Sequence, residues 1–312
     1  MSCSTNPQGI LRFTQNDFNM KILISGSTGF IGSRLVPLLR EIGHDVTALV
    51  RSSNEPGLLW DPNKKKINIS RLENYDAFVH LSGESINGKW TASKKKKIID
   101  SRVITTKFLA ECISKLKNPP KAFISSSAIG FYGNRGDEEL TEQSFPGIGF
   151  LAEVCKAWEA ETNPVAEKGI RVVNIRTGLV LSPDGGALQK LLLPFKLGVG
   201  GKIGSGNQWW SWITVNDLLR IYQYSIENNS VNGAINTVSP NPQRNSAFVK
   251  TLGKVLHRPT IFPLPSSIVK LIFGEMGQEL LLDGQKAIPK KLTESGFKFE
   301  QTELESALRS ML

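Results

Sequence analysis

The sequence predicts an α/β fold of the Rossmann type, a doubly wound parallel sheet joined to a small C-terminal substrate lobe. Two observations carry this prediction. Short apolar segments alternate with amphipathic ones over residues 20–180, which is typical of parallel strands linked by helices. Three glycines, Gly26, Gly29 and Gly32, stand between the first apolar segment and the first amphipathic one. At such a turn a dinucleotide pyrophosphate can approach the backbone and the N-terminus of a helix.

The individual elements are expected in the order that such a sheet requires. Strands are expected at residues 21–25, 45–50, 75–82, 121–125, 171–176 and 233–238, and helices at 30–40, 94–116, 150–167, 214–226 and 302–312. Ligands of open parallel sheets bind beyond the carboxyl ends of the strands. The residues that follow each strand are therefore the candidates for a functional site.

The 312 residues divide into segments of different character. Residues 1–19 are polar and read as a flexible N-terminal tail. Residues 20–180 are expected to form the dinucleotide-binding domain, to which residues 207–240 return. Glycine and proline become frequent after this first part, so residues 181–206 and 241–312 are expected to form the smaller lobe.

The composition of the sequence argues against membrane-spanning, metal-binding and nucleic-acid-binding proteins. No apolar stretch approaches the roughly 20 residues that span a bilayer, so no membrane segment is expected. Cys3, Cys112 and Cys155 lie far apart without metal-ligand spacing, which favours a cytoplasmic protein without a metal site. The net charge of +10 favours anionic partners. The lysine runs at 64–66 and 94–97 lack interleaved aromatics, so a solvated surface is favoured over a nucleic-acid site.

The end of the second predicted strand indicates which nicotinamide cofactor would bind. An acidic residue there hydrogen-bonds an adenosine 2′-hydroxyl, whereas an arginine pairs with a 2′-phosphate. The strand ends in Val50, Arg51 and Ser52 with no acidic residue in reach. We therefore expect NADP(H), with the planar guanidinium of Arg51 on the phosphate. Arg34 on the first helix is a further candidate, and an ordinary surface arginine is the alternative for Arg51.

Three landmarks in order resemble the extended short-chain dehydrogenase/reductase superfamily. They are the Gly-x-x-Gly-x-x-Gly turn, the strand end at 80–84 and the serine-rich strand end at 125–133. More narrowly, an atypical epimerase-like, NADP-binding branch with a C-terminal domain of unknown function is resembled by segments 83–86, 193–198, 203–208, 212–213 and 284–289. The resemblance covers residues 20–312 and implies a Rossmann fold with a bound nicotinamide cofactor.

The motif, the strand ends and the resemblance together indicate a set of cofactor-binding residues. They are Gly26, Ser27, Thr28, Gly29, Phe30, Ile31, Gly32, Val50, Arg51, Ser52, Leu81, Ser82, Gly83, Arg102, Ser125, Ser126 and Arg176. Arg102 and Arg176 enter this set through the resemblance to the branch alone.

The resemblance also implies a catalytic set, but one member is missing. In the superfamily a Tyr four residues before a Lys transfers the proton, and a Ser orients the substrate oxygen. Ser127 and Lys156 have the expected separation, yet Ala152 stands where the Tyr belongs. Glu84, directly after a strand, is the first candidate for the proton-transfer residue. The other candidates are Glu153, Cys155 and Tyr132.

Two functions follow from this pattern. The first is an NADP(H)-dependent oxidoreductase or nucleotide-sugar-epimerase-like enzyme, in which Ser127 polarises an oxygen and Lys156 holds the ribose. The alternative is a non-catalytic NADP(H)-binding sensor or protein-interaction module, because the tyrosine is absent. The substrate and the oligomeric state have no signal in the sequence.

Overall fold

The computed structural model describes residues 4–5, 11–12 and 19–312. Most of the predicted tail, residues 1–19, therefore lies outside the described residues. The centre of the chain is an eight-stranded sheet. In spatial order its strands are β14 (Gly233–Thr237), β10 (Arg171–Thr177), β8 (Ala122–Ala128), β7 (Ala77–His80), β3 (Lys21–Ser25), β4 (Asp45–Val50), β5 (Leu58–Asp61) and β6 (Lys66–Ile67). All neighbours are parallel except β5 and β6.

The order of the strands reverses at the centre of the sheet. From β3 the chain moves outward through β4 and β5, and then returns to β7 on the other side of β3. Such a reversal leaves a crevice at the carboxyl ends of the two central strands. Ser25 and His80 stand opposite each other at these ends, and Ser25 Oγ lies 2.6 Å from His80 Nδ1. The predicted Rossmann-type sheet is therefore confirmed.

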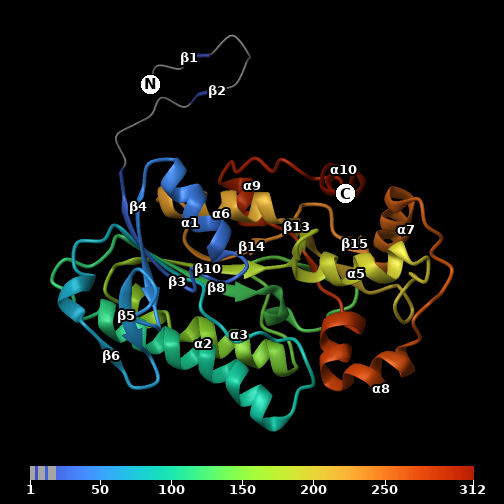
Figure 1. Cartoon of the computed structure of the whole chain (residues 1–312), viewed down its shortest axis with the longest axis horizontal. Coiled ribbons are helices and arrows are strands. Elements are labelled where there is room, and N and C mark those ends of the chain that lie inside the picture. The colour runs from blue at the N-terminus through green and yellow to red at the C-terminus, as the bar shows by residue number, and fades with distance from the viewer. Residues whose placement is uncertain (1–3, 6–10, 13–18) are drawn as a thin grey trace.

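Helices cover both faces of the sheet (Figure 1). On one face lie α1 (Gly32–Glu41) and α6 (Val215–Glu227), and on the other α2 (Ala92–Ile113) and α3 (Phe150–Ala160). Leu35 of α1 and Leu218 of α6 pack with Ile24 in one buried cluster. Phe108 of α2 packs with Phe78 on the opposite face. Strand residues that alternate between the two faces thus fill two separate cores.

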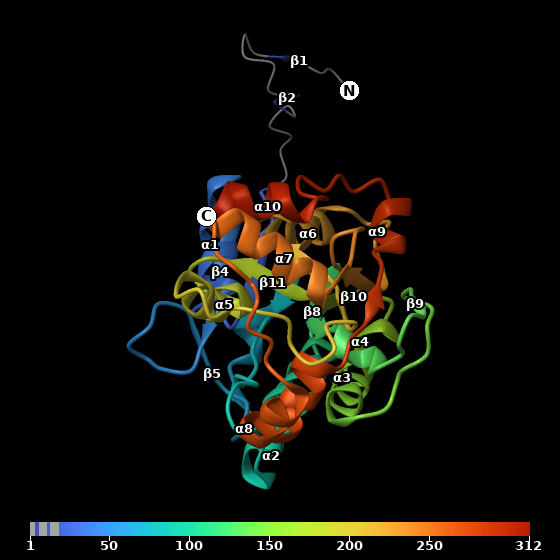
Figure 2. The same ribbon diagram turned by 90° about the vertical axis from the view of Figure 1, so that its right-hand side faces the viewer.

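A second group of elements packs beside the sheet around its own core. It contains β11 (Leu179–Ser182), α5 (Gly186–Lys196), β12 (Trp209–Trp210), β13 (Trp212–Thr214), β15 (Gln243–Arg244), α7 (Asn245–Leu256), α8 (Ser266–Gly277), η3 (Gln278–Leu282) and α10 (Leu304–Met311). Trp212 and Phe248 are fully buried in this core. Figure 2 shows α7 and α10 side by side on this flank, with α8 below them.

Short elements complete the chain. They are β1 (Ser4–Thr5), β2 (Leu11–Arg12), η1 (Ile69–Leu72), η2 (Ile129–Tyr132), β9 (Glu139–Leu140), α4 (Asn163–Ala166), β16 (Lys286–Ala287) and α9 (Lys290–Glu294). The helix expected at 150–167 is in fact two helices, α3 and α4. Pro164 lies at the start of α4, where a backbone N–H has no intrahelical partner to lose. In the interior of one continuous helix the same proline would remove a hydrogen bond and break the helix.

Candidate functional site

The glycine turn after β3 has the shape that a dinucleotide requires. Gly26 has φ +75°, and a Cβ there would lie 2.8 Å from the Leu81 carbonyl carbon. A Cβ on Gly32 would lie 2.2 Å from Gly26 O, whereas one on Gly29 would meet only that same oxygen at 3.3 Å. Gly26 and Gly32 therefore permit tight packing inside the turn. Gly29 is exposed and leaves the backbone open to a ligand.

The N-terminus of α1 is prepared for an anion. Its cap residue Ile31 makes no side-chain capping bond, and no acidic residue stands in the first turn. The first N–H groups of a helix lack intrahelical partners and carry a positive partial charge. Thr28 is exposed and Phe30 is half-buried beside them. The backbone here fits the phosphates of a dinucleotide.

The end of β4 presents an arginine without a protein partner. Val50 is buried, while Arg51 and Ser52 are exposed. Within residues 19–312, the Arg51 side chain has no hydrogen bond or ion pair. Arg34 differs, because its guanidinium lies 2.5 Å from an Asp184 carboxylate oxygen. Of the two arginines, only Arg51 is therefore open to an incoming phosphate.

A second cation lies at the end of β7. The guanidinium carbon of Arg102 would be 3.4 Å from a Cβ on Gly83. Arg102 Nη1 donates to the carbonyls of Glu84 and Ile98, both at 3.1 Å, and the guanidinium lies over the Trp158 ring. Burial lowers the pKa of Arg102. No carboxylate within residues 19–312 lies within ion-pair distance of it, although the charge of nearby Glu84 partly offsets the effect of burial on its pKa.

Glu84 follows β7, as expected, but its carboxyl is occupied. Lys94 Nζ donates to Glu84 Oε1 at 2.7 Å. The hydrogen bond from Lys94 holds the pKa of Glu84 below its usual range. The ionised form that this bond favours can accept a proton but has none to donate.

Lys156 is not brought to the buried face of α3. Its side chain is exposed, whereas Ala152 and Cys155 on the same helix are buried. Cys155 thus holds the inward position one residue before the lysine. Burial raises the pKa of the Cys155 thiol to about 12, so the thiol stays protonated. The spacing from Ser127 pointed to Lys156, but the rotation of α3 turns its side chain to solvent.

The serines at the end of β8 point to different faces of the sheet. Ser126 Oγ lies 2.9 Å from the hydroxyl of Tyr222 on α6. Ser125 is fully buried and stands opposite His80 of β7. Ser127 faces the same side as Ser125, because side chains alternate along a strand.

Ser127 belongs to a buried chain of hydrogen bonds that joins three neighbouring strands. Its Oγ donates to Glu159 Oε1 at 2.6 Å. Arg176 Nε and Nη2 donate to the two carboxylate oxygens of Glu159, each at 2.8 Å. Arg176 Nη1 donates to the Tyr132 hydroxyl at 2.9 Å, and that hydroxyl donates to Asn236 Oδ1 at 2.7 Å.

Burial and charge shape this network. Ser127 and Arg176 are both 4% exposed. Burial raises the pKa of Tyr132 to about 12. Burial opposes the charge of Arg176, but its hydrogen bonds to Glu159 raise the pKa. The guanidinium of Arg176 is therefore committed to Glu159 and Tyr132 in this structure, although the resemblance placed it on the cofactor.

Sequence reasoning missed Glu159 and Asn236. Glu159 follows Trp158 on α3 and looks like an ordinary helix carboxylate, and Asn236 interrupts an apolar strand. The polar Asn236 inside an apolar strand is the one signal in the sequence that could have indicated a buried network.

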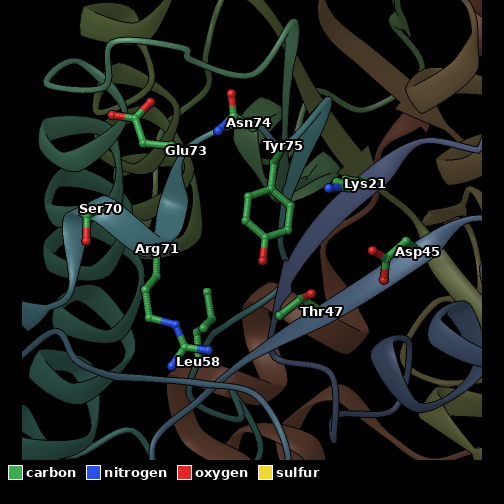
Figure 3. Close-up of a pocket in the computed structure, with 9 residues that line it drawn as sticks. All are labelled: Lys21, Asp45, Thr47, Leu58, Ser70, Arg71, Glu73, Asn74 and Tyr75. Carbon is green, nitrogen blue, oxygen red and sulfur yellow. The ribbon is translucent and has the colours of Figure 1, made fainter.

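A cavity lies at the opposite end of the strands, where they begin. It measures about 300 Å³, and Figure 3 shows the Tyr75 hydroxyl pointing between Thr47 and Arg71. Its lining residues are Lys21, Asp45, Thr47, Leu58, Ser70, Arg71, Glu73, Asn74 and Tyr75. Lys21 and Asp45 begin their strands, so this cavity lies opposite the glycine turn and does not belong to the strand-end site.

Two further expectations can be compared with the described residues. In residues 4–5, 11–12 and 19–312, no group of three or more His, Cys, Asp or Glu side chains has an arrangement that could hold a metal ion. No helix in the same residues has both the length and the apolar character needed to cross a membrane.

Comparison with known proteins identifies the family. The profile described as "NAD dependent epimerase/dehydratase family" matches residues 22–237, and "Domain of unknown function (DUF1731)" matches residues 264–311. The chain is 37% identical over 297 residues to the human "Epimerase family protein SDR39U1", covering 94% of this chain and 100% of that protein. It is 36% identical over 300 residues to "Epimerase family protein YfhF" of Bacillus subtilis, covering 94% of this chain and 98% of that protein.

A solved structure agrees with this assignment. The human SDR39U1 (isoform 2), whose crystal structure was solved with NADPH, superposes with a TM-score of 0.86 at 36% identity. The superposition covers 94% of this chain and 99% of the human chain. Glycine turn, strand order and C-terminal domain thus lead to one conclusion: this chain belongs to the NAD-dependent epimerase/dehydratase family, in its SDR39U1-like branch with a C-terminal DUF1731 domain.

Proposed function

We propose that this protein binds NADP(H) and uses it in a hydride-transfer reaction, as an oxidoreductase or an epimerase-like enzyme. The observation that carries the proposal is the glycine turn, in which Gly29 leaves the backbone open between two glycines that hold the turn closed. The human relative solved with NADPH supports the same cofactor. When bound, a nicotinamide supplies a site that accepts or releases hydride.

Residues of this chain hold the cofactor at three strand ends. The backbone at residues 26–32 and the start of α1 take the pyrophosphate. Arg51, which has no partner within residues 19–312, pairs with the 2′-phosphate, and Ser52 adds a hydroxyl. Leu81, Ser82 and Gly83 line the crevice between β3 and β7.

Arg102 supplies the positive charge that the resemblance assigned to Lys156. Arg102 is partly buried at the end of β7 with Nε and Nη2 free of protein acceptors within residues 19–312. A guanidinium with open donors suits ribose hydroxyls or another electron-rich group. Ser125, Ser126 and Arg176 stay as proposed members of the site, through the shape of the β8 and β10 ends and not through free side-chain donors.

The second candidate is a non-catalytic NADP(H) sensor. One observation favours it: Ala152 occupies the buried position where the superfamily has its tyrosine, and Lys156 is exposed. In this case the chain would bind the cofactor through the same turn and report the redox state to a partner.

Calorimetric titration with NADPH, NADP⁺ and NADH tests the proposal. We expect NADPH to bind with a Kd at least about tenfold lower than that of NADH, a difference of about 1.4 kcal/mol. The same protein is then assayed for NADPH oxidation with small aldehydes and ketones by loss of nicotinamide absorbance. Binding with turnover supports the enzyme, binding without turnover supports the sensor, and no binding contradicts both.

A further inference from the structure

We propose that Ser127 and Glu159 form a proton relay in place of the missing tyrosine, and that the substrate presents a hydroxyl group to Ser127. The inference rests on the proposed NADP(H)-linked hydride transfer and names the substrate group at that site. It begins with one hydrogen bond, in which Ser127 Oγ donates to Glu159 Oε1 at 2.6 Å.

The direction of this bond is fixed by Arg176. Its guanidinium donates to both carboxylate oxygens of Glu159 at 2.8 Å. The side chain of Arg176 is 5% exposed and that of Glu159 is 12% exposed. A guanidinium has only donors, so both Glu159 oxygens act as acceptors, and the Ser127 hydroxyl is the donor in its bond to Oε1.

This direction changes what Ser127 can do for a substrate. A serine with its proton engaged offers only the lone pairs of its oxygen. It can accept a hydrogen bond from an alcohol, but it cannot polarise a carbonyl without breaking its bond to Glu159. Ser127 lies at the carboxyl end of β8, where ligands of such sheets bind. The matching substrate group is therefore a hydroxyl.

The relay balances as an alcohol oxidation. The hydroxyl proton of the substrate moves to Ser127 Oγ while the serine proton moves to Glu159 Oε1. The C–H bond of the alcohol carbon breaks, the hydride goes to the oxidised nicotinamide, and the O–H electron pair forms the new carbonyl bond. In the reverse direction the proton on Glu159 returns through Ser127 to the oxygen that gains hydride.

Competing proton acceptors at the strand ends are already engaged. The Tyr132 hydroxyl accepts from Arg176 and donates to Asn236, and burial raises its pKa to about 12. The carboxyl of Glu84 is paired with Lys94. Ser127 has no donor to its oxygen within residues 19–312, so its lone pairs remain available.

Two variants and one matched control test the relay. Ser127→Ala removes the hydroxyl, and Glu159→Gln keeps the shape of the side chain but removes the proton acceptor. Glu167→Gln makes the same change at an exposed carboxylate. The probes are NADP⁺ with cyclohexanol, sorbitol and glucose, and NADPH alone for binding.

We expect both site variants to lower kcat about 100-fold or more, the usual contribution of a positioned acid or base, with little change in KM. NADPH affinity should stay within about threefold, well below one decade in Kd, and Glu167→Gln should match the wild type. Ser127→Thr, which keeps the hydroxyl, should retain most of the rate. A merely structural role for Glu159 would instead lower NADPH affinity in step with kcat, whereas a loss of thermal stability is expected in either case because Glu159→Gln weakens the buried pair with Arg176.

A second readout needs no turnover. The infrared carboxylate stretch should shift between wild type and Ser127→Ala, and this shift should vanish when Glu159 is already Gln. No shift, or a wild-type kcat in Glu159→Gln, overturns the relay and leaves the proposed function standing. A wild type that binds NADPH but oxidises none of the probes overturns the relay in favour of the sensor. Failure to bind NADPH overturns the proposed function itself.

Discussion

The two halves of the strand-end edge are built in opposite ways. Around β3 and β4 the site consists of backbone shape and open groups, with Gly29 and Arg51 exposed and free of side-chain partners within residues 19–312. Around β8, β10 and β14 the polar groups are buried and bonded to one another, from Ser127 through Arg176 to Asn236.

The two halves therefore contribute differently to cofactor binding and to the stability of the fold. In the open half a ligand supplies the missing bonds, so substitutions there should mainly weaken cofactor binding. In the closed half the bonds already exist within the protein, so substitutions there should lower the free energy of unfolding, in addition to the loss of kcat expected at Ser127 and Glu159. Four experiments, in order of decreasing expected effect, distinguish effects on cofactor binding from effects on the free energy of unfolding in the two halves.

Arg176→Met should have the largest effect on stability. It leaves the carboxylate of Glu159 buried without the two guanidinium bonds that now compensate it. Breaking a buried ion pair on one side costs about 3–5 kcal/mol. Urea unfolding measures the loss, and the double variant Arg176→Met/Glu159→Gln should recover part of it. A loss under about 1 kcal/mol, which is the range of an exposed ion pair, would contradict the proposed difference between the two halves.

Acid should destabilise the protein through His80, which ties β7 to β3 under the glycine turn. Burial lowers its pKa from the usual 6.5 to about 3. As the pH falls, His80 is therefore protonated in the unfolded chain before it is protonated in the folded protein. The free energy of unfolding thus decreases below pH 6.5, approaching about 1.4 kcal/mol per pH unit, until the folded histidine is protonated as well. Between pH 6.5 and 4.5 this amounts to about 2.3 kcal/mol, because the unfolded histidine is already half protonated at pH 6.5. Unfolding of His80→Gln across the same range should show a shallower slope, and an equal slope would contradict the assignment.

Gly32→Ala and Gly29→Ala should separate packing from ligand access within the turn. The new Cβ would stand 2.2 Å from Gly26 O in the first variant and 3.3 Å in the second. Overpacking should cost Gly32→Ala about 1–3 kcal/mol of stability. Gly29→Ala should unfold like the wild type but bind NADPH about tenfold more weakly or worse, because its methyl group occupies the approach of the pyrophosphate. Calorimetry and urea unfolding of both variants measure the two effects.

Arg51→Ala should have the smallest effect and act on binding alone. Its guanidinium is exposed and without a partner within residues 19–312, so stability should not change. Losing a charge-assisted hydrogen bond costs about 1.5 kcal/mol or more, about tenfold in the Kd for NADPH. Titration with NADH serves as the control, since it lacks the 2′-phosphate. Equal losses for both cofactors would show that Arg51 does not read the phosphate.

Much of the fold could be read from local patterns. The apolar runs at 21–25 and 171–176 and the helix near 214–226 match β3, β10 and α6 closely, because burial on a sheet or on one helix face imposes a fixed period. Helix ends were less certain, as Pro164 shows by dividing the segment expected at 150–167.

What the sequence by itself determined is the part of the site made of backbone. Glycine spacing after a strand predicts a turn and its opening, because the absence of a Cβ is a local property. The tertiary structure alone decided how distant side chains pair. Glu159 meets Ser127 and Arg176 only because α3 packs across β8 and β10, and Lys156 faces solvent because of the rotation of that same helix. Such pairings depend on packing between segments far apart in the chain, which no local spacing encodes.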